Sequence, residues 1–211
     1  NNLGNGTFGS VCVITNLKDQ KDYILKVLNI KGIFNGNKQL QFVNDSKMLR
    51  KLGHHSIVKF IGSNLQSLSN PEKFEPSIIT EYFQNGSLKE LIDKEKTLFN
   101  STKRYISLIG ISSALKYLHQ NNIFDCNLKP ENIVYDDNYY PHISDFYLSK
   151  LFTDKNKLTI EGQIPYLAPE LLNGQDNHES SADVYSFGIL AYSIVTDKKP
   201  FFELGQISMN E

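Results

Sequence analysis

The sequence predicts an α+β fold, with a small antiparallel β-sheet and one helix followed by a mainly helical second half. Three observations support this prediction. Apolar and polar residues alternate through residues 3–31, the apolar period becomes helical over residues 39–52, and helical patterns dominate after residue 87. With 40% hydrophobic and 21% charged residues among 211, the composition is that of a globular protein and argues against disorder.

The charge and cysteine content argue against several classes of protein. Lys plus Arg number 22 and Asp plus Glu number 23, and this balance disfavours a dedicated binder of nucleic acid or of anionic membranes. The two cysteines, Cys12 and Cys126, lie outside any C-x-x-C pattern, which disfavours a disulfide scaffold or a cysteine zinc site. We therefore expect a reducing, cytoplasmic location.

No part of this chain is expected to span a membrane. The most apolar run, residues 187–195, is about half the length that a bilayer requires. The chain begins with Asn and shows no signal-peptide pattern, so we expect it to be a segment of a longer protein.

In the first half, strands surround a single helix. Strands are predicted at residues 11–14 and 23–28, and again at 57–61 and 77–83, with a polar loop over residues 63–76. Within the helix over residues 39–52, the side chains of Phe42, Leu49 and Leu52 share one face, and Asp45 falls on the same stripe. A carboxylate on an apolar face needs a cation, because its burial without a partner is unfavourable.

The second half begins with two predicted helices. Ser87 caps a helix over residues 88–94, with Glu90 at the capping-box position. A longer helix over residues 102–120 ends at an Asn-Asn pair, and the apolar residues at helical spacing in it are Ile106, Ile109, Leu115 and Leu118.

Short strands and a last helix complete the second half. The strands are predicted at residues 133–135 and 142–143, and a long polar loop runs from there to Tyr166. Residues 182–196 are apolar on most faces, so this helix is predicted to be buried.

Two features of the first half suggest a phosphate site. Residues 4–11 read G-x-G-x-x-G-x-V, and glycines allow a strand–turn–strand to lie close over phosphates. A strand follows, not a helix, which disfavours a dinucleotide site. Lys26 lies among apolar neighbours and is either an edge lysine in solvent or a phosphate-binding lysine paired with Asp45. The carboxylate on the helix face favours the second interpretation.

Further motifs follow in a fixed order: Asp125–Asn132, Asp145-Phe146-Tyr147, Ala168-Pro169-Glu170 and Asp183–Gly188. With them, essentially the whole chain resembles a eukaryotic-type protein kinase domain. Residues 80–88 are most similar to the tyrosine-kinase-like serine/threonine kinases. The resemblance implies a bilobal kinase fold, with an N-lobe over residues 1–83, a C-lobe over 84–211 that stops short of its last helices, and a hinge at 81–86.

The resemblance implies a site for ATP and Mg²⁺. It assigns the phosphates to the glycine loop and Lys26, the adenine to the backbone of Glu81 and Phe83, and the gatekeeper position to Thr80. Ile24 stands where the family usually has alanine, and Asp45 where it usually has glutamate. The implied ATP-binding residues are Leu3, Gly4, Gly6, Gly9, Val11, Ile24, Lys26, Asp45, Thr80, Glu81 and Phe83, and the implied magnesium ligands are Asn132 and Asp145.

The same resemblance points to a damaged phosphoryl-transfer step. Asn127 occupies the position of the catalytic aspartate, and an amide does not accept a proton at neutral pH. Lys129, which would steady the transferred phosphate, is retained. Four other residues also depart from the family pattern. Cys126 replaces the arginine that binds an activation-loop phosphate, and Asp125 replaces a histidine that packs into the hydrophobic spine. Tyr147 replaces the glycine after Asp145-Phe146, and Gln163 replaces a threonine.

Three functions are consistent with these residues. The favoured one is a pseudokinase that binds ATP and magnesium, transfers phosphate weakly or not at all, and acts on an allosteric protein partner. The first alternative is an active serine/threonine kinase of low turnover that phosphorylates a protein substrate. The second is a protein-interaction module without nucleotide, in which Ile24 and Asp45 prevent ATP binding.

Overall fold

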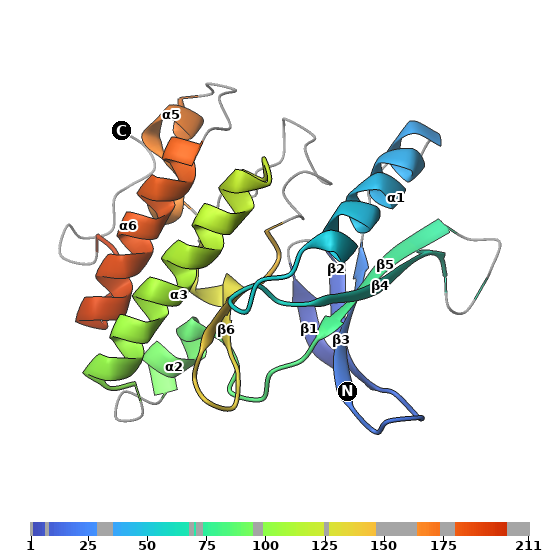
Figure 1. Cartoon of the computed structure of the whole chain (residues 1–211), viewed down its shortest axis with the longest axis horizontal. Helices are drawn as coiled ribbons and strands as arrows, with labels where there is room; N and C mark the ends of the chain where they lie inside the picture. The colour runs from blue at the N-terminus through green and yellow to red at the C-terminus, as the bar shows by residue number, and fades with distance from the viewer. Residues whose placement is uncertain are drawn as a thin grey trace.

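The computed structural model describes residues 2–6, 9–28, 36–67, 70, 74–94, 99–124, 127–146, 164–173 and 180–201. An antiparallel sheet with helix α1 forms one part, which we call the sheet part, and helices α2, α3, α5 and α6 form the other, the helical part (Figure 1). The sheet comes first in the chain, and the helical part follows it. The predicted α+β class is confirmed, and the arrangement is consistent with the expected bilobal fold.

The sheet contains five strands in the order β1-β2-β3-β5-β4, and each neighbouring pair is antiparallel. The strands predicted over residues 11–14 and 23–28 are confirmed as β2 and β3. The turn between β2 and β3 is closed by Asn16, whose side chain accepts the Lys18 N–H at 2.9 Å. The strands are β1 (Asn2–Gly6), β2 (Gly9–Thr15), β3 (Asp22–Leu28), β4 (Phe60–Gln66) and β5 (Phe74–Glu81).

The position of β4 corrects the sequence prediction. A strand was predicted over residues 57–61 and a loop over 63–76, but β4 spans Phe60–Gln66 and β5 begins at Phe74. Because β4 is the edge of the sheet beside β5, its polar side chains Ser63 and Asn64 remain exposed, and the strand shows no apolar alternation. Ile57 instead forms an isolated bridge with Ile143.

Helix α1 (Gly36–Lys51) confirms the predicted helix and its apolar face. Phe42 is 1% exposed and Leu49 is 3% exposed, and both belong to the hydrophobic core. Leu52 lies just after the last helical residue and packs against the same core. The helix runs along β4, which fixes it over the edge of the sheet (Figure 1).

The predicted cap of helix α2 (Leu88–Lys94) is confirmed. The Ser87 N–H donates to Oε2 of Glu90 at 2.9 Å, and the Glu90 N–H donates to Oγ of Ser87 at 3.4 Å. These reciprocal bonds satisfy two of the N–H groups that a helix start leaves open.

Helix α3 (Ser101–Gln120) begins where Oδ1 of Asn100 accepts the Lys103 N–H and ends at the predicted Asn121. Of the apolar residues that the sequence analysis placed at helical spacing, Ile109 lies away from the core, because it is 51% exposed. The buried face is turned by about half a helical turn from Ile109 and consists of Ser107, Ile111, Ala114, Leu115 and Leu118.

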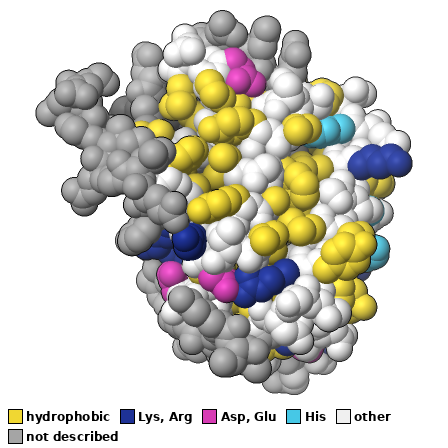
Figure 2. Space-filling view, turned by 90° about the vertical axis from the view of Figure 1, so that its left-hand side faces the viewer, with side chains coloured by type: hydrophobic (Ala, Val, Ile, Leu, Met, Phe, Trp, Pro, Cys, Tyr) yellow, Lys and Arg dark blue, Asp and Glu magenta, His cyan; other side chains and the backbone are white. Residues whose placement is uncertain are grey.

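Helix α6 (Ser180–Thr196) is only half buried, which corrects the prediction of burial on most faces. Leu190 and Ile194 are fully buried, whereas Val184, Tyr192 and Val195 are 62%, 42% and 60% exposed. Figure 2, which views the molecule from the α6 side, shows hydrophobic side chains gathered on this face. Among the described residues, no helix is long and apolar enough to cross a membrane.

Polar contacts join α3 to α6. Nε2 of His119 lies 2.8 Å from Oδ2 of Asp183, which is 2% exposed. At the other end, Arg104 forms an ion pair with Asp197 and also donates to the carbonyl of Ile194. A cation at the carbonyl end of a helix is favourable, so Arg104 stabilises the end of α6.

The remaining described elements are short. They are η1 (Pro130–Asn132), β6 (Ile133–Tyr135), β7 (Pro141–Ile143), η2 (Ile164–Tyr166) and α5 (Pro169–Leu172). The two predicted short strands are β6 and β7, which pair with each other. Most of the predicted polar loop before Tyr166, residues 147–163, lies outside the described residues.

Candidate functional site

Strand register brings four of the predicted nucleotide-binding residues to one face of the sheet. Lys26 on β3 lies opposite Val11 on β2, and Ile24 on β3 lies opposite Thr80 on β5. Residues directly opposite in antiparallel strands share a face, and so do residues two apart in one strand. Val11, Ile24, Lys26 and Thr80 therefore form one continuous surface.

The glycine motif forms the hairpin of β1 and β2 beside this surface. Gly4 pairs with Val11, and Gly6 pairs with Gly9. Gly9 has a φ of 147°, a conformation that favours glycine. At these three glycines the hairpin presents backbone without side chains. The side chain of Leu3 lies outside the described residues.

Lys26 forms an ion pair with Asp145, a residue 119 positions later in the chain. The two side chains are 14% and 18% exposed, so the pair is largely screened from water. It joins the sheet part to the helical part. Sequence analysis assigned Asp145 to magnesium and Asp45 to Lys26; the Lys26–Asp45 pairing stays a prediction, while the contact with Asp145 is present.

Asn132 connects Asp145 to the loop that contains Asn127. Its Nδ2 donates to the carbonyl of Asn127 at 2.8 Å, and its own carbonyl accepts the Ser144 N–H at 2.8 Å and the Ser144 hydroxyl at 3.1 Å. Because the amide nitrogen is used in this way, Oδ1 is the Asn132 atom suited to bind a cation. Sequence analysis missed Ser144; its only signal is its position immediately before Asp145.

The loop from Asn127 to Lys129 is held in a defined conformation. Asn127 has a φ of 47°, in the left-handed region that asparagine tolerates, and Leu128 is 2% exposed. Lys129 is partly buried, which lowers the pKa of its ammonium, while the charges of Glu131 and Asp145 act in the opposite direction. Asn127, at the predicted base position, is half-buried.

The predicted hinge lies where β5 ends. The Glu81 N–H donates to the Lys59 carbonyl at 3.1 Å, and Oε1 of Glu81 accepts the Lys59 N–H at 2.7 Å. The ring of Phe83 stacks on His142, with the centroids 4.3 Å apart. These contacts hold Glu81 against Lys59, just before β4, and the ring of Phe83 against His142 of β7. Four predicted departures from the kinase pattern lie outside the described residues: Asp125, Cys126, Tyr147 and Gln163.

The donor groups fit a magnesium–phosphate ligand. Mg²⁺ prefers oxygen ligands and is usually held by one or two protein carboxylates together with substrate phosphates. Asp145 supplies a carboxylate, Asn132 supplies an amide oxygen, and Lys26 supplies a cation beside them. Within the described residues there is no group of three or more His, Cys, Asp or Glu side chains that would hold a metal without such a ligand.

Comparison with known proteins agrees with this geometry. The family model "Protein kinase domain" matches residues 1–211 of the chain. The chain is 32% identical over 201 residues to a cAMP-dependent protein kinase catalytic subunit from Dictyostelium discoideum, an alignment that covers 95% of this chain and 30% of the relative.

Two further relatives come from a plant and a yeast. A cysteine-rich receptor-like protein kinase 11 from Arabidopsis thaliana is 34% identical over 209 residues, covering 94% of this chain and 30% of the relative. An Aurora kinase from Yarrowia lipolytica is 32% identical over 204 residues, covering 96% and 53%. The chain thus spans between about a third and a half of the length of these relatives. Because the family model matches the whole sequence, the chain belongs to the protein kinase domain family.

Proposed function

We propose that this kinase domain binds ATP with magnesium and transfers phosphate to protein hydroxyl groups weakly or not at all. One observation supports the proposal. Lys26 pairs with Asp145, and Asn132 bonds to Ser144, the residue before Asp145, while an asparagine stands where the family has its catalytic aspartate. The parts that hold phosphates and metal are retained, and the group that accepts a proton is lost.

The retained residues divide the binding between them. The β1–β2 hairpin and Lys26 bind the phosphates, and Asp145 and Oδ1 of Asn132 bind magnesium. ATP supplies the γ-phosphoryl group for transfer. Since Lys26 and Asp145 pair directly in this structure, binding of phosphate by Lys26 and of magnesium by Asp145 would replace this ion pair.

The loss at Asn127 affects the transfer step alone. A hydroxyl group that attacks the γ-phosphorus must give up a proton, and an amide can position this hydroxyl but does not take the proton. A positioned general base contributes about 10²–10⁴ in rate. We therefore propose a regulatory role, in which bound nucleotide stabilises the closed arrangement of an N-lobe (1–83) and a C-lobe (84–211) that a protein partner recognises.

Thermal unfolding with and without ATP and magnesium tests the binding step. A ligand at 100 times its dissociation constant adds about 2.7 kcal/mol to the free energy of unfolding. For a domain of this size that corresponds to a rise of about 5 to 10 °C in the melting temperature. The rise should need magnesium and should disappear in Asp145→Ala.

Asp137→Ala serves as the matched control, because Asp137 is an exposed aspartate in the turn between β6 and β7. The control should keep the full rise. If the wild-type protein is folded and its melting temperature does not respond to ATP with magnesium, the binding proposal is wrong.

An active kinase of low turnover is the second candidate, and the geometry around Asn127 favours it. The Asn127 carbonyl is bonded to Asn132, which is bonded to Ser144, so the loop is assembled although the base is missing. Phosphoryl transfer passes through a loose transition state, in which positioning and charge supply most of the catalysis. Asn127→Asp should then raise turnover at least tenfold.

The third candidate is a protein-interaction module that binds no nucleotide. It was suggested by Ile24 and Asp45, which differ from the usual family residues and would prevent ATP binding. Saturable ATP binding that is abolished by Lys26→Met excludes it. Lys21→Met is the matched control, because Lys21 is an exposed lysine just before β3. Membership of the tyrosine-kinase-like group and a cytoplasmic location are part of our proposal and rest on the sequence.

A further inference from the structure

The backbone of Asp145 lies in an unusual conformation. Strand β7 ends at Ile143, and two residues later Asp145 has a φ of 60°, in the left-handed region. Aspartate tolerates this region better than most residues, but the conformation persists only where neighbouring contacts hold it. The contacts made by the residues before and after Asp145 therefore determine where its carboxylate lies.

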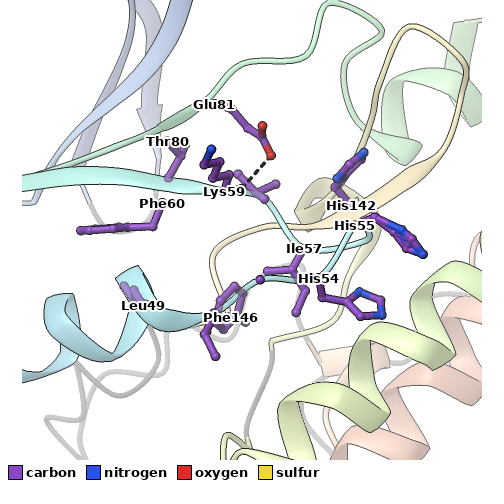
Figure 3. Close-up of a pocket in the computed structure, with 13 residues that line it drawn as sticks. Leu49, His54, His55, Ile57, Lys59, Phe60, Thr80, Glu81, His142 and Phe146 are labelled. Carbon is purple, nitrogen blue, oxygen red and sulfur yellow. Dashed lines mark hydrogen bonds between the residues drawn. The ribbon is translucent and has the colours of Figure 1, made fainter.

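The residue after Asp145 is held by the hydrophobic core. Phe146 is 2% exposed and belongs to the same buried cluster as Leu49 and Ile57. In Figure 3 its ring lies between the side chains of Leu49, from α1, and Ile57, from the loop before β4. Because apolar packing is non-directional, this contact anchors the segment without fixing the orientation of Asp145.

The residue before Asp145 is held by two hydrogen bonds to one acceptor. The Ser144 N–H donates to the Asn132 carbonyl at 2.8 Å, and the Ser144 hydroxyl donates to the same oxygen at 3.1 Å. A carbonyl oxygen has two lone pairs and can accept both bonds. Ser144 is 9% exposed and Asn132 is 5% exposed, so loss of the hydroxyl would not be made good by bulk water.

These two bonds extend the pairing of β6 with β7 to the candidate metal ligands. Ile133 pairs with Ile143 at the end of the two strands, so Asn132 and Ser144 are the next residues along. Asn132 is itself one candidate magnesium ligand, and Ser144 directly precedes the other, Asp145. The Ser144 hydroxyl thus adds a directional contact between the segments that carry the two ligands.

We propose that Ser144 is a positioning residue for magnesium, because its hydroxyl holds Asn132 and Asp145 at the separation that this cation requires. Mg²⁺ demands near-ideal octahedral geometry, whereas the larger Ca²⁺ accepts longer and more variable distances to its ligands. Ser144 therefore sets which cation supports nucleotide binding and acts through the two ligands. This inference rests on the proposed function, since it concerns the cation that accompanies ATP.

Isothermal titration calorimetry with ATP, performed once with magnesium and once with calcium, tests the inference without an activity assay. The wild type should bind ATP more tightly with magnesium than with calcium. Ser144→Ala should weaken binding with magnesium by about 10- to 100-fold, the usual effect of removing a group that orients a metal ligand. Binding with calcium should change far less, so the preference for magnesium is lost.

Ser144→Thr is the rescue variant, because it keeps the hydroxyl and should keep the preference for magnesium. Ser107→Ala is the matched control. Ser107 is fully buried in α3, where its hydroxyl donates to the Lys103 carbonyl at 2.7 Å and lies 2.9 Å from the hydroxyl of Tyr135. Its loss should lower the melting temperature and leave the ratio of the two dissociation constants as in the wild type.

A double variant tests whether Ser144 acts through Asn132. Asn132→Ala removes the amide ligand but keeps the backbone carbonyl that accepts both Ser144 bonds. Ser144→Ala should therefore weaken binding with magnesium much less in Asn132→Ala than in the wild type, because residues that act as a unit are not additive.

The outcomes separate this inference from the proposed function. A folded wild type whose ATP binding does not respond to magnesium overturns both. If the wild type binds ATP with magnesium and Ser144→Ala keeps the preference for magnesium over calcium, the inference alone is overturned. Equal losses with both cations also overturn it, since they would show a general structural role. So would an effect of Ser144→Ala that is as large in Asn132→Ala as in the wild type.

Discussion

His54 is held in one tautomer by its two hydrogen-bond partners. Nδ1 accepts the Ser56 N–H at 3.1 Å, so the proton is on Nε2, which lies 3.1 Å from Oγ of Ser113. A second proton on the ring would remove the acceptor for Ser56. Burial, and the nearby His55 and His142, lower the pKa of His54 below its ordinary value.

The stability of the chain should therefore fall on mild acidification. Below the ordinary histidine pKa, the unfolded chain binds protons that folded His54 resists, and the free energy of unfolding decreases as pH falls. His54→Asn should flatten this dependence between about pH 7.5 and pH 5.5, because an asparagine Oδ1 accepts the Ser56 N–H without titrating. Urea unfolding at several pH values measures the slope.

Some slope should remain in that variant, because burial also lowers the pKa of His142. A slope as steep as that of the wild type would contradict the assignment to His54. His55→Asn is the matched control, since His55 is exposed.

At the level of single residues, the sequence indicated which side chains form the site but not which of them touch. Motif spacing identified Lys26, Asn132 and Asp145. The Lys26–Asp145 pair joins positions 119 apart, and only the folded chain brings them together. The link through Ser144 was missed because a serine beside an aspartate has no distinctive pattern.

Two glycines in helices occupy opposite environments. Gly110 in α3 lies where the helix meets β7, and a Cβ there would be 2.6 Å from Cγ of Pro141 and 3.0 Å from Oγ of Ser56. Gly188 in α6 faces open space, with nothing within 4 Å of an added Cβ. The same substitution should therefore have opposite effects at the two positions.

We expect Gly110→Ala to destabilise the chain by about 1–3 kcal/mol, because it overpacks the contact of α3 with β7. Gly188→Ala should stabilise it by about 0.5–1 kcal/mol, because alanine has the higher helix propensity and meets no neighbour. Denaturant midpoints of the two variants, measured side by side, give both values. Changes of the same sign at both positions would contradict this account of the packing.

At the level of helices and strands, periodicity predicted where the elements lie better than it predicted which of their faces are buried. Helices with caps, such as α2 and α3, were predicted within a residue of their observed ends. Strand β4 was misplaced because an edge strand tolerates polar residues on both faces. The exposure of Ile109 and of one face of α6 depends on which neighbours pack against each helix, and local sequence does not contain that information.

At the level of the whole molecule, two of the contacts that the described residues make between the first and second halves of the chain differ in kind. In one, backbone bonds tie the loop before β4 to β7: Val58 N–H donates to the Ile143 carbonyl at 3.0 Å, and Ile143 N–H donates to the Ser56 carbonyl at 2.9 Å. In the other, the contact is the ion pair of Lys26 and Asp145. Backbone bonds of this kind persist, whereas an ion pair can be replaced by phosphate and magnesium. Nucleotide binding is therefore expected to act on the second junction.

In the proposed function, Asn127 separates nucleotide binding from phosphoryl transfer. The most direct measurement is the rate at which labelled γ-phosphate moves from ATP to serine and threonine substrates, in the wild type and in Asn127→Asp. Asn44→Asp is the control, because it makes the same chemical change at an exposed position of α1.

We predict that the wild type and Asn44→Asp fall well below the usual kinase rates of about 1–100 per second, and that Asn127→Asp is faster by about 10²–10⁴. A wild-type rate within the usual range would contradict the account. A slow wild type with no gain in Asn127→Asp would show that the impairment lies outside Asn127.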